Sequence, residues 1–80
     1  MDRELVLEKV TEIAADVFGE DDLVLEDETT AADVEKWDSL THLALMSELE
    51  DEFDITFTMG EVQSLKNVGE LVDIIVAKVG

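Results

Sequence analysis

The spacing of apolar residues in the first part of the chain most constrains its fold. Apolar side chains recur there every three or four residues, at Val6, Val10, Ile13, Ala14 and Val17. Charged residues fill the positions between them, as on an amphipathic helix. The pattern predicts a helix over residues 2–18. It is expected to end at Gly19, because glycine readily adopts the left-handed conformation found past a helix C-terminus.

A second helix is predicted to begin at Asp38 or Ser39. Its apolar residues are Leu40, Leu43, Leu45, Met46, Leu49 and Phe53. These positions cover more of the helix surface than the single stripe of a helix buried on one face. We therefore expect some of them, Leu40 and Leu43 first, to lie outside the core and near the serine.

Two further signals mark helices near the end of the chain. Thr58 and Glu61 have the spacing of a capping box, which predicts a short helix through about residue 65. Asn67 is predicted to cap a last helix, because a run of apolar residues follows it from Leu71 to Val79.

Residues 20–36 break the helical pattern and predict a long loop, pinned to the core by Leu23 and Leu25. A loop of this length is uncommon in a compact domain unless it is functional or held by its own side chains. The whole pattern predicts an all-α fold with three longer helices, one short third helix and a long loop between the first two. Eighty residues have room for one modest core, so residues 1–80 are expected to form a single domain.

The composition excludes several classes of function. The chain has 22 acidic and 5 basic residues, a net charge of −17, which repels nucleic acids and anionic membranes and favours basic protein partners. Cysteine is absent and His42 is the single histidine, so no disulfide, cysteine nucleophile or metal site is expected. We expect a monomer. Because no signal-like start and no long apolar run occur, we also expect a cytoplasmic location.

Ser39, at the predicted start of the second helix, permits four interpretations. Either Ser39 or Asp38 can cap the helix by accepting hydrogen bonds from its free amides. A hydrolase would need a base, and His42 lies on the same helix face, but no G-x-S-x-G motif frames the serine. A regulatory phosphoserine is disfavoured by the neighbouring acids and the lack of nearby arginines.

The fourth interpretation is an anchor for a prosthetic group. The N-terminus of a helix favours a negatively charged group, so a phosphodiester on Ser39 would be well placed. A chain without cysteine cannot itself hold a thioester. A phosphopantetheine arm on Ser39 would supply the missing thiol.

The segment around this serine resembles the acyl carrier protein family. The D-S-L motif of the family matches residues 38–40, and its L-E-x-E-F run matches residues 49–53. Further matches are Leu43, Met46 and Ile55. The resemblance covers essentially the whole chain, including the short third helix.

The resemblance implies a four-helix carrier-protein bundle in which Ser39 carries 4′-phosphopantetheine, with Asp38 and Leu40 beside it. A Mg²⁺-dependent phosphopantetheinyl transferase would attach the arm from coenzyme A. The thiol of the arm would hold acyl groups as thioesters for acyl-transferring, ligating and condensing enzymes of fatty-acid, polyketide or related biosynthesis. The chain itself would not be an enzyme.

Two departures from the family pattern indicate a specialised, discrete member. Thr41 and Ala44 stand where fatty-acid carriers commonly have acidic residues. Trp37 stands where housekeeping members have a small residue, as in carriers of gene-cluster pathways. We expect Trp37 to pack against His42 at the helix start. The alternative is that it lines the place where the arm or a partner rests.

Partner recognition is assigned to residues on and just before the second helix. They are Trp37, Leu43, Met46, Glu48, Glu50, Asp51 and Glu52. The acidic members crowd the end of the helix where the dipole disfavours them, which indicates a docking surface for basic partners. Three alternatives stay open: a peptidyl, aminoacyl or D-alanyl carrier, a calcium-binding helical protein, and an acidic adaptor that blocks basic surfaces.

Overall fold

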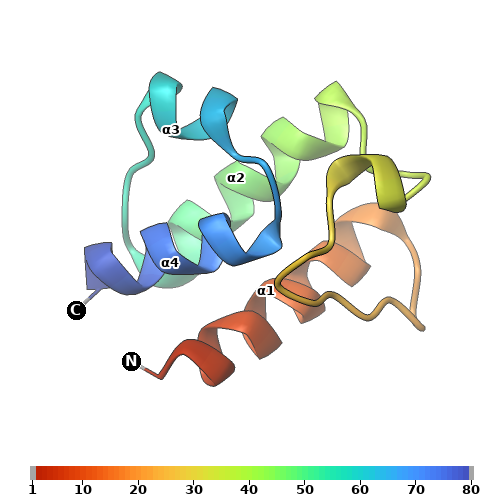
Figure 1. The fold of residues 1–80 in the computed structure, drawn as a ribbon, viewed down its shortest axis with the longest axis horizontal. Coiled ribbons are helices and arrows are strands. Elements are labelled where there is room, and N and C mark those ends of the chain that lie inside the picture. Colours follow the sequence, from red (N-terminus) through yellow and green to blue (C-terminus); the bar gives the residue numbers. More distant parts are fainter. Residues whose placement is uncertain (1, 80) are drawn as a thin grey trace.

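The computed structural model describes residues 2–79, and the regular structure of this part of the chain is entirely helical (Figure 1). The elements in chain order are α1 (Arg3–Phe18), the short 3₁₀ helix η1 (Ala31–Asp33), α2 (Ser39–Phe53), α3 (Met59–Ser64) and α4 (Val68–Val79). The predicted all-α architecture is confirmed, with three longer helices, a short helix third among the α-helices, and a long connection between α1 and α2.

One hydrophobic core lies where α1 packs against both α2 and α4 (Figure 1). The apolar spacing that predicted α1 places Val6, Val10 and Ala14 fully inside this core. Leu49 of α2 and Ile75 of α4 are likewise completely buried. Burial of these side chains stabilises the bundle, because removing apolar surface from water is the main driving force of folding.

The helix ends follow the predicted signals. Gly19 has a φ of 70° and its N–H donates to the carbonyl of Ala15, as expected for a left-handed C-cap. Thr58 and Glu61 form the predicted capping box at the start of α3. The side chain of Asn67 accepts a hydrogen bond from the amide of Glu70 in the first turn of α4.

The long connection is anchored at several points. Leu25 is buried and Leu23 packs partly buried against the core, as expected. Sequence reasoning missed η1, although Thr30 and Asp33 have the spacing of a capping box and do form one. Val34, just after η1, is buried as well.

The same connection is also tied to the N-terminus of α4. The amide of Val68 donates to the carbonyl of Thr29 (2.8 Å) and the amide of Gly69 to that of Asp27 (2.9 Å). A Cβ at position 69 would lie 3.1 Å from the carbonyl oxygen of Asp27, so glycine allows this close approach. Arg3 bridges the carboxylates of Asp27 and Asp73. The residues that precede α2 are therefore held on a fixed path.

Candidate functional site

The N-terminus of α2 is capped by Asp38, and Ser39 is the first residue of the helix. One carboxylate oxygen of Asp38 accepts hydrogen bonds from the amides of Leu40 and Thr41, each at 3.0 Å. The hydroxyl of Thr41 in turn accepts from the amide of Asp38 at 2.8 Å. These bonds satisfy the start of the helix without using Ser39.

The hydroxyl of Ser39 is consequently free. Ser39 is exposed, and its side chain makes no hydrogen bond within the part of the chain that the structure describes. Between the two candidates for the cap, the structure selects Asp38. A nucleophile that another enzyme must reach is well served by an exposed position on the rigid first turn of a helix.

The electrostatics of this turn differ from the expectation that helix amides would hold a phosphodiester. The amides of Leu40 and Thr41 are already occupied by the carboxylate of Asp38. That carboxylate has a lowered pKa, chiefly because the backbone amide of Thr41 donates to it, so it is charged at neutral pH. A phosphodiester on Ser39 would feel the positive end of the helix dipole, but also the negative charge of Asp38.

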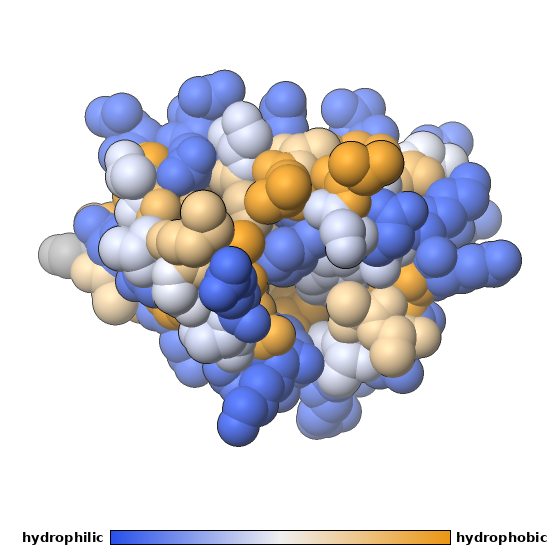
Figure 2. Space-filling model, turned by 90° about the horizontal axis from the view of Figure 1, so that it is seen from above, coloured by the Kyte–Doolittle hydropathy of each residue, from blue (hydrophilic) through white to orange (hydrophobic). Residues whose placement is uncertain are grey.

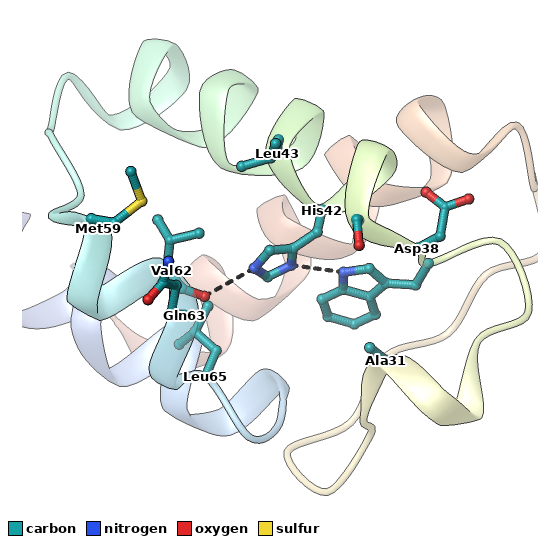
Figure 3. A pocket seen from close by; sticks show the side chains of 10 residues that line it. Ala31, Asp38, His42, Leu43, Met59, Val62, Gln63 and Leu65 are labelled. Atoms are coloured by element: carbon teal, nitrogen blue, oxygen red, sulfur yellow. Dashed lines mark hydrogen bonds between the residues drawn. The ribbon is translucent and has the colours of Figure 1, made fainter.

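An open groove of about 700 Å³ runs from Ser39 between α2 and α3 (Figure 3). Most of its lining is apolar, with Trp37, Leu43 and Met59 among the larger side chains. Figure 2 shows this side of the molecule from above, with a hydrophobic patch among hydrophilic residues. The exposed apolar side chains nearest the serine in sequence are Leu40 and Leu43, as expected, and they are 80% and 58% exposed.

A chain of hydrogen bonds crosses the base of this groove (Figure 3). The indole N–H of Trp37 donates to Nδ1 of His42 at 2.9 Å, and Nε2 of the same ring lies 3.1 Å from the carbonyl oxygen of Val62. An indole nitrogen can only donate, so Nδ1 must accept and the ring proton sits on Nε2. His42 thus joins the residue before the α2 cap to α3.

The predicted contact between Trp37 and His42 is confirmed, with ring centroids 6.0 Å apart, but it is a hydrogen bond as well as a packing contact. The geometry also weighs against a serine hydrolase. One nitrogen of His42 accepts from Trp37 and the other faces Val62, so neither is directed at Ser39 as a base would be.

The position of α3 is also fixed by an ion pair at Glu61, the residue before Val62. Nζ of Lys78 in α4 lies 3.0 Å from the carboxylate of Glu61. The pKa of Glu61 is lowered, first by the backbone amide of Thr58 and then by Lys78. Val62 and Leu65 pack partly buried against the core, so α3 forms a fixed wall of the groove despite its shortness.

Two residues assigned to partner recognition are corrected by their burial. Met46 is 3% exposed and Trp37 is 8% exposed, so neither presents a surface to a partner in this conformation. Met46 belongs to the core, together with Leu45, Leu49 and Phe53 of the same helix. Trp37 instead lines the groove.

The four acidic residues assigned to partner recognition fall into two groups. Glu48 and Asp51 are exposed, and no ion pair involves them among the described residues. The carboxylate of Glu50 accepts a hydrogen bond from the amide of Phe57 at 2.8 Å, so it holds the turn after α2. Glu52 lies 3.6 Å from Nζ of Lys9.

Two residues of the groove, Met59 and Ala31, are not among the site residues predicted from the sequence. Met59 lines the groove and is 71% exposed, and Ala31 lines it from η1. No local pattern marks Ala31, because the folding of the long connection brings it to the groove. Among residues 2–79, the structure brings together no group of three histidine or acidic side chains that could hold a metal ion. None of the described helices is long and apolar enough to cross a membrane.

Comparison with known proteins gives a uniform result. The family model for the phosphopantetheine attachment site matches residues 8–75. An acyl carrier protein of Rubrobacter xylanophilus is 36% identical over 76 residues, which are 95% of this chain and 94% of the relative. One of Clostridium acetobutylicum is 37% identical over 73 residues, covering 91% and 95% of the two chains.

A solved structure agrees with these relatives. The solution NMR structure of the holo acyl carrier protein of Geobacter metallireducens superposes with a TM-score of 0.87. It is 44% identical to this chain, and the match covers 92% of this chain and 85% of that one.

Fold and site together define a helical carrier domain, with an exposed serine at the start of its second long helix and an apolar groove beside it. The chain belongs to the acyl carrier protein family, whose prosthetic group is 4′-phosphopantetheine. The residues at the start of α2 fit such a group, because the hydroxyl of Ser39 is exposed and unbonded among the described residues.

Proposed function

We propose that Ser39 is the attachment point of the 4′-phosphopantetheine arm and that the arm carries acyl groups as thioesters between partner enzymes. The free hydroxyl of Ser39 is the observation that carries this proposal. Asp38 performs the capping that the serine would otherwise perform, and leaves it available. The match of residues 38–40 to the D-S-L motif of the family supports the same residue.

Attachment would be catalysed by a separate phosphopantetheinyl transferase. Oγ of Ser39 would attack the β-phosphorus of coenzyme A, and adenosine 3′,5′-bisphosphate would leave as the pyrophosphate bond breaks. The hydroxyl proton would pass to a base of the transferase, because His42 has no nitrogen directed at Ser39. This chain supplies only a positioned nucleophile, and the transferase supplies the metal ion.

Cargo transfer would be the work of partner enzymes of fatty-acid, polyketide or related specialised biosynthesis. The net charge of −17 and the exposed carboxylates of Glu48 and Asp51 favour partners with basic docking surfaces. Leu40 and Leu43 would provide the apolar contact beside the serine. Trp37 in place of a small residue supports a dedicated pathway over general fatty-acid synthesis.

Intact-mass measurement tests the attachment directly. The native chain is incubated with coenzyme A, Mg²⁺ and a promiscuous phosphopantetheinyl transferase, beside Ser39→Ala and Ser47→Ala. Ser47 is an exposed serine on the same helix and serves as the matched control. The native chain and Ser47→Ala are expected to gain one arm, and Ser39→Ala none. The assignment would be contradicted if Ser47→Ala alone failed to gain the arm, or if Ser39→Ala gained one.

A further inference from the structure

Two cavities meet at Trp37 and His42. The outer groove of about 700 Å³ begins at Ser39, and a smaller cavity of about 60 Å³ reaches Leu71 of α4. Both cavities are lined by Ala31, Trp37, His42 and Leu65. These shared side chains form the wall between the two spaces, and Leu71, which is 1% exposed, lies on the inner side of it.

Hydrogen bonds within the protein hold Trp37 and His42 in place in this wall. His42 accepts from Trp37 and faces the carbonyl of Val62, so its ring spans the space between α2 and α3 (Figure 3). Opening the wall would leave the nearly buried indole N–H of Trp37 without an acceptor, which is unfavourable. The Phe18 ring, 5.6 Å from that of Trp37, supports the indole from behind.

The inner cavity is too small to hold an aliphatic chain as it stands. Its volume of about 60 Å³ corresponds to roughly two water molecules. The outer groove is much larger but open to solvent, so an aliphatic chain lying in it would stay partly exposed. A long chain would be buried further, towards Leu71, only by displacing the wall.

We propose that Trp37 and His42 form a partition that confines the tethered acyl group to the outer groove, and thus restrict the cargo to short or polar acyl groups. This inference rests on the proposed role of Ser39 as the attachment point, because the groove begins at that residue. His42 and Trp37 are then specificity-determining residues. They touch the cargo at its far end and take no part in the chemistry.

Loading with acyl groups of increasing length tests the partition. A promiscuous transferase is used to transfer the whole acyl-phosphopantetheine from butyryl-, octanoyl- or dodecanoyl-coenzyme A to Ser39. The backbone amide resonance of Leu71 then reports on the inner cavity. The indole N–H resonance of Trp37, the single tryptophan of the chain, reports on the wall.

In the native chain, the Leu71 resonance is expected to be the same for all three cargoes, and the melting temperature to be the same for butyryl and dodecanoyl forms. In His42→Ala the Leu71 resonance should move progressively with chain length. The melting temperature of that variant should rise by about 4 °C or more from the shortest to the longest cargo. Trp37→Phe, which keeps a ring but removes the donor, is a second way to open the wall.

Two control variants separate the partition from general damage. His42→Gln keeps one acceptor and one donor on its side chain and should behave as the native chain does. Gln63→Ala removes a side chain from the outer groove alone and should also leave Leu71 unaffected. A Leu71 resonance that moves with chain length in the native protein would overturn the partition. Failure of the native chain to gain any acyl arm would instead overturn the proposed function, and the partition with it.

Discussion

Asp38 and Thr41 hydrogen-bond to each other's backbone amides across the first turn of α2. The amide of Thr41 donates to the carboxylate of Asp38 at 3.0 Å, and the amide of Asp38 donates to the hydroxyl of Thr41 at 2.8 Å. Thr41 stands where many fatty-acid carriers have an acidic residue, and here its hydroxyl completes the capping box. These two hydrogen bonds fix the first turn of α2 through the side chains of Asp38 and Thr41. Ser39 lies between these residues, and its side chain is not needed to cap the helix.

Two substitutions of Asp38 should distinguish the contribution of its helix cap to stability from that of its charge. Asp38→Ala removes the acceptor for two amides and should lower the melting temperature, because alanine is a poor N-cap. Asp38→Asn keeps a good cap and should melt close to the native chain at neutral pH. Thermal denaturation followed by circular dichroism gives the comparison. Equal melting temperatures of the alanine and asparagine variants would show that the cap contributes nothing to stability.

The lowered pKa of Asp38 predicts a specific pH dependence. Because the pKa in the folded chain lies below the ordinary value of 3.8, Asp38 contributes stability above that value. The contribution is lost as the pH falls through the lowered pKa and the carboxylate is protonated. The difference in unfolding free energy between the native chain and Asp38→Asn should therefore be constant near neutral pH and change only in acid. Denaturant unfolding over a pH series measures it, and a change near pH 6 would contradict the assignment.

Substitution by alanine should affect stability at one leucine of α2 and modification by the transferase at another. Leu49→Ala empties a fully buried position and should destabilise the fold by about 2–5 kcal/mol. Leu40→Ala, at a position 80% exposed, should change stability by less than about 0.5 kcal/mol. Modification by the transferase should instead be slower in Leu40→Ala, because Leu40 adjoins the serine on the surface. If Leu40→Ala were modified at the native rate, Leu40 would not be part of the surface that the transferase contacts.

The exposed carboxylates of Glu48 and Asp51 in α2 should strengthen binding to basic partners. Glu48→Lys with Asp51→Lys should weaken binding to the transferase severalfold at low salt, and the difference should shrink as ionic strength screens the charges. The matched control, Glu4→Lys with Glu8→Lys, makes the same change in net charge on exposed positions of α1. Surface plasmon resonance at two salt concentrations compares the pairs. Equal effects of both pairs would show that total charge alone matters.

Helices and caps could be predicted from the sequence because their signals are local. The apolar spacing of residues 6–17, the glycine at position 19 and the capping box of Thr58 and Glu61 each lie within a few residues of what they determine. The same holds for Asp38, whose side chain accepts from the amides of Leu40 and Thr41, two and three residues later. The exposure of Leu40 also followed from local pattern, because the apolar set of α2 is wider than one buried face.

Contacts between distant segments could not be predicted in this way. The sequence pattern assigns Glu50 to a docking surface, but its carboxylate accepts a hydrogen bond from the amide of Phe57 across a turn in which Asp54 has a φ of 54°. Nothing in the local sequence marks that bond. The approach of His42 to Val62, twenty residues later, likewise depends on how α3 is placed by the whole fold. The groove and its inner wall are products of such contacts.

Thiol titration tests the central claim most directly, because the chain contains no cysteine. Before modification the native protein should show no thiol under denaturing conditions, and after treatment with coenzyme A and transferase it should show one per chain. That thiol should disappear on loading with an acyl group and return when hydroxylamine cleaves the thioester. Ser39→Ala should show none at any stage. A modified native chain without a titratable thiol, or a thiol in Ser39→Ala, would contradict the account of Ser39 as the anchor of the carrier arm.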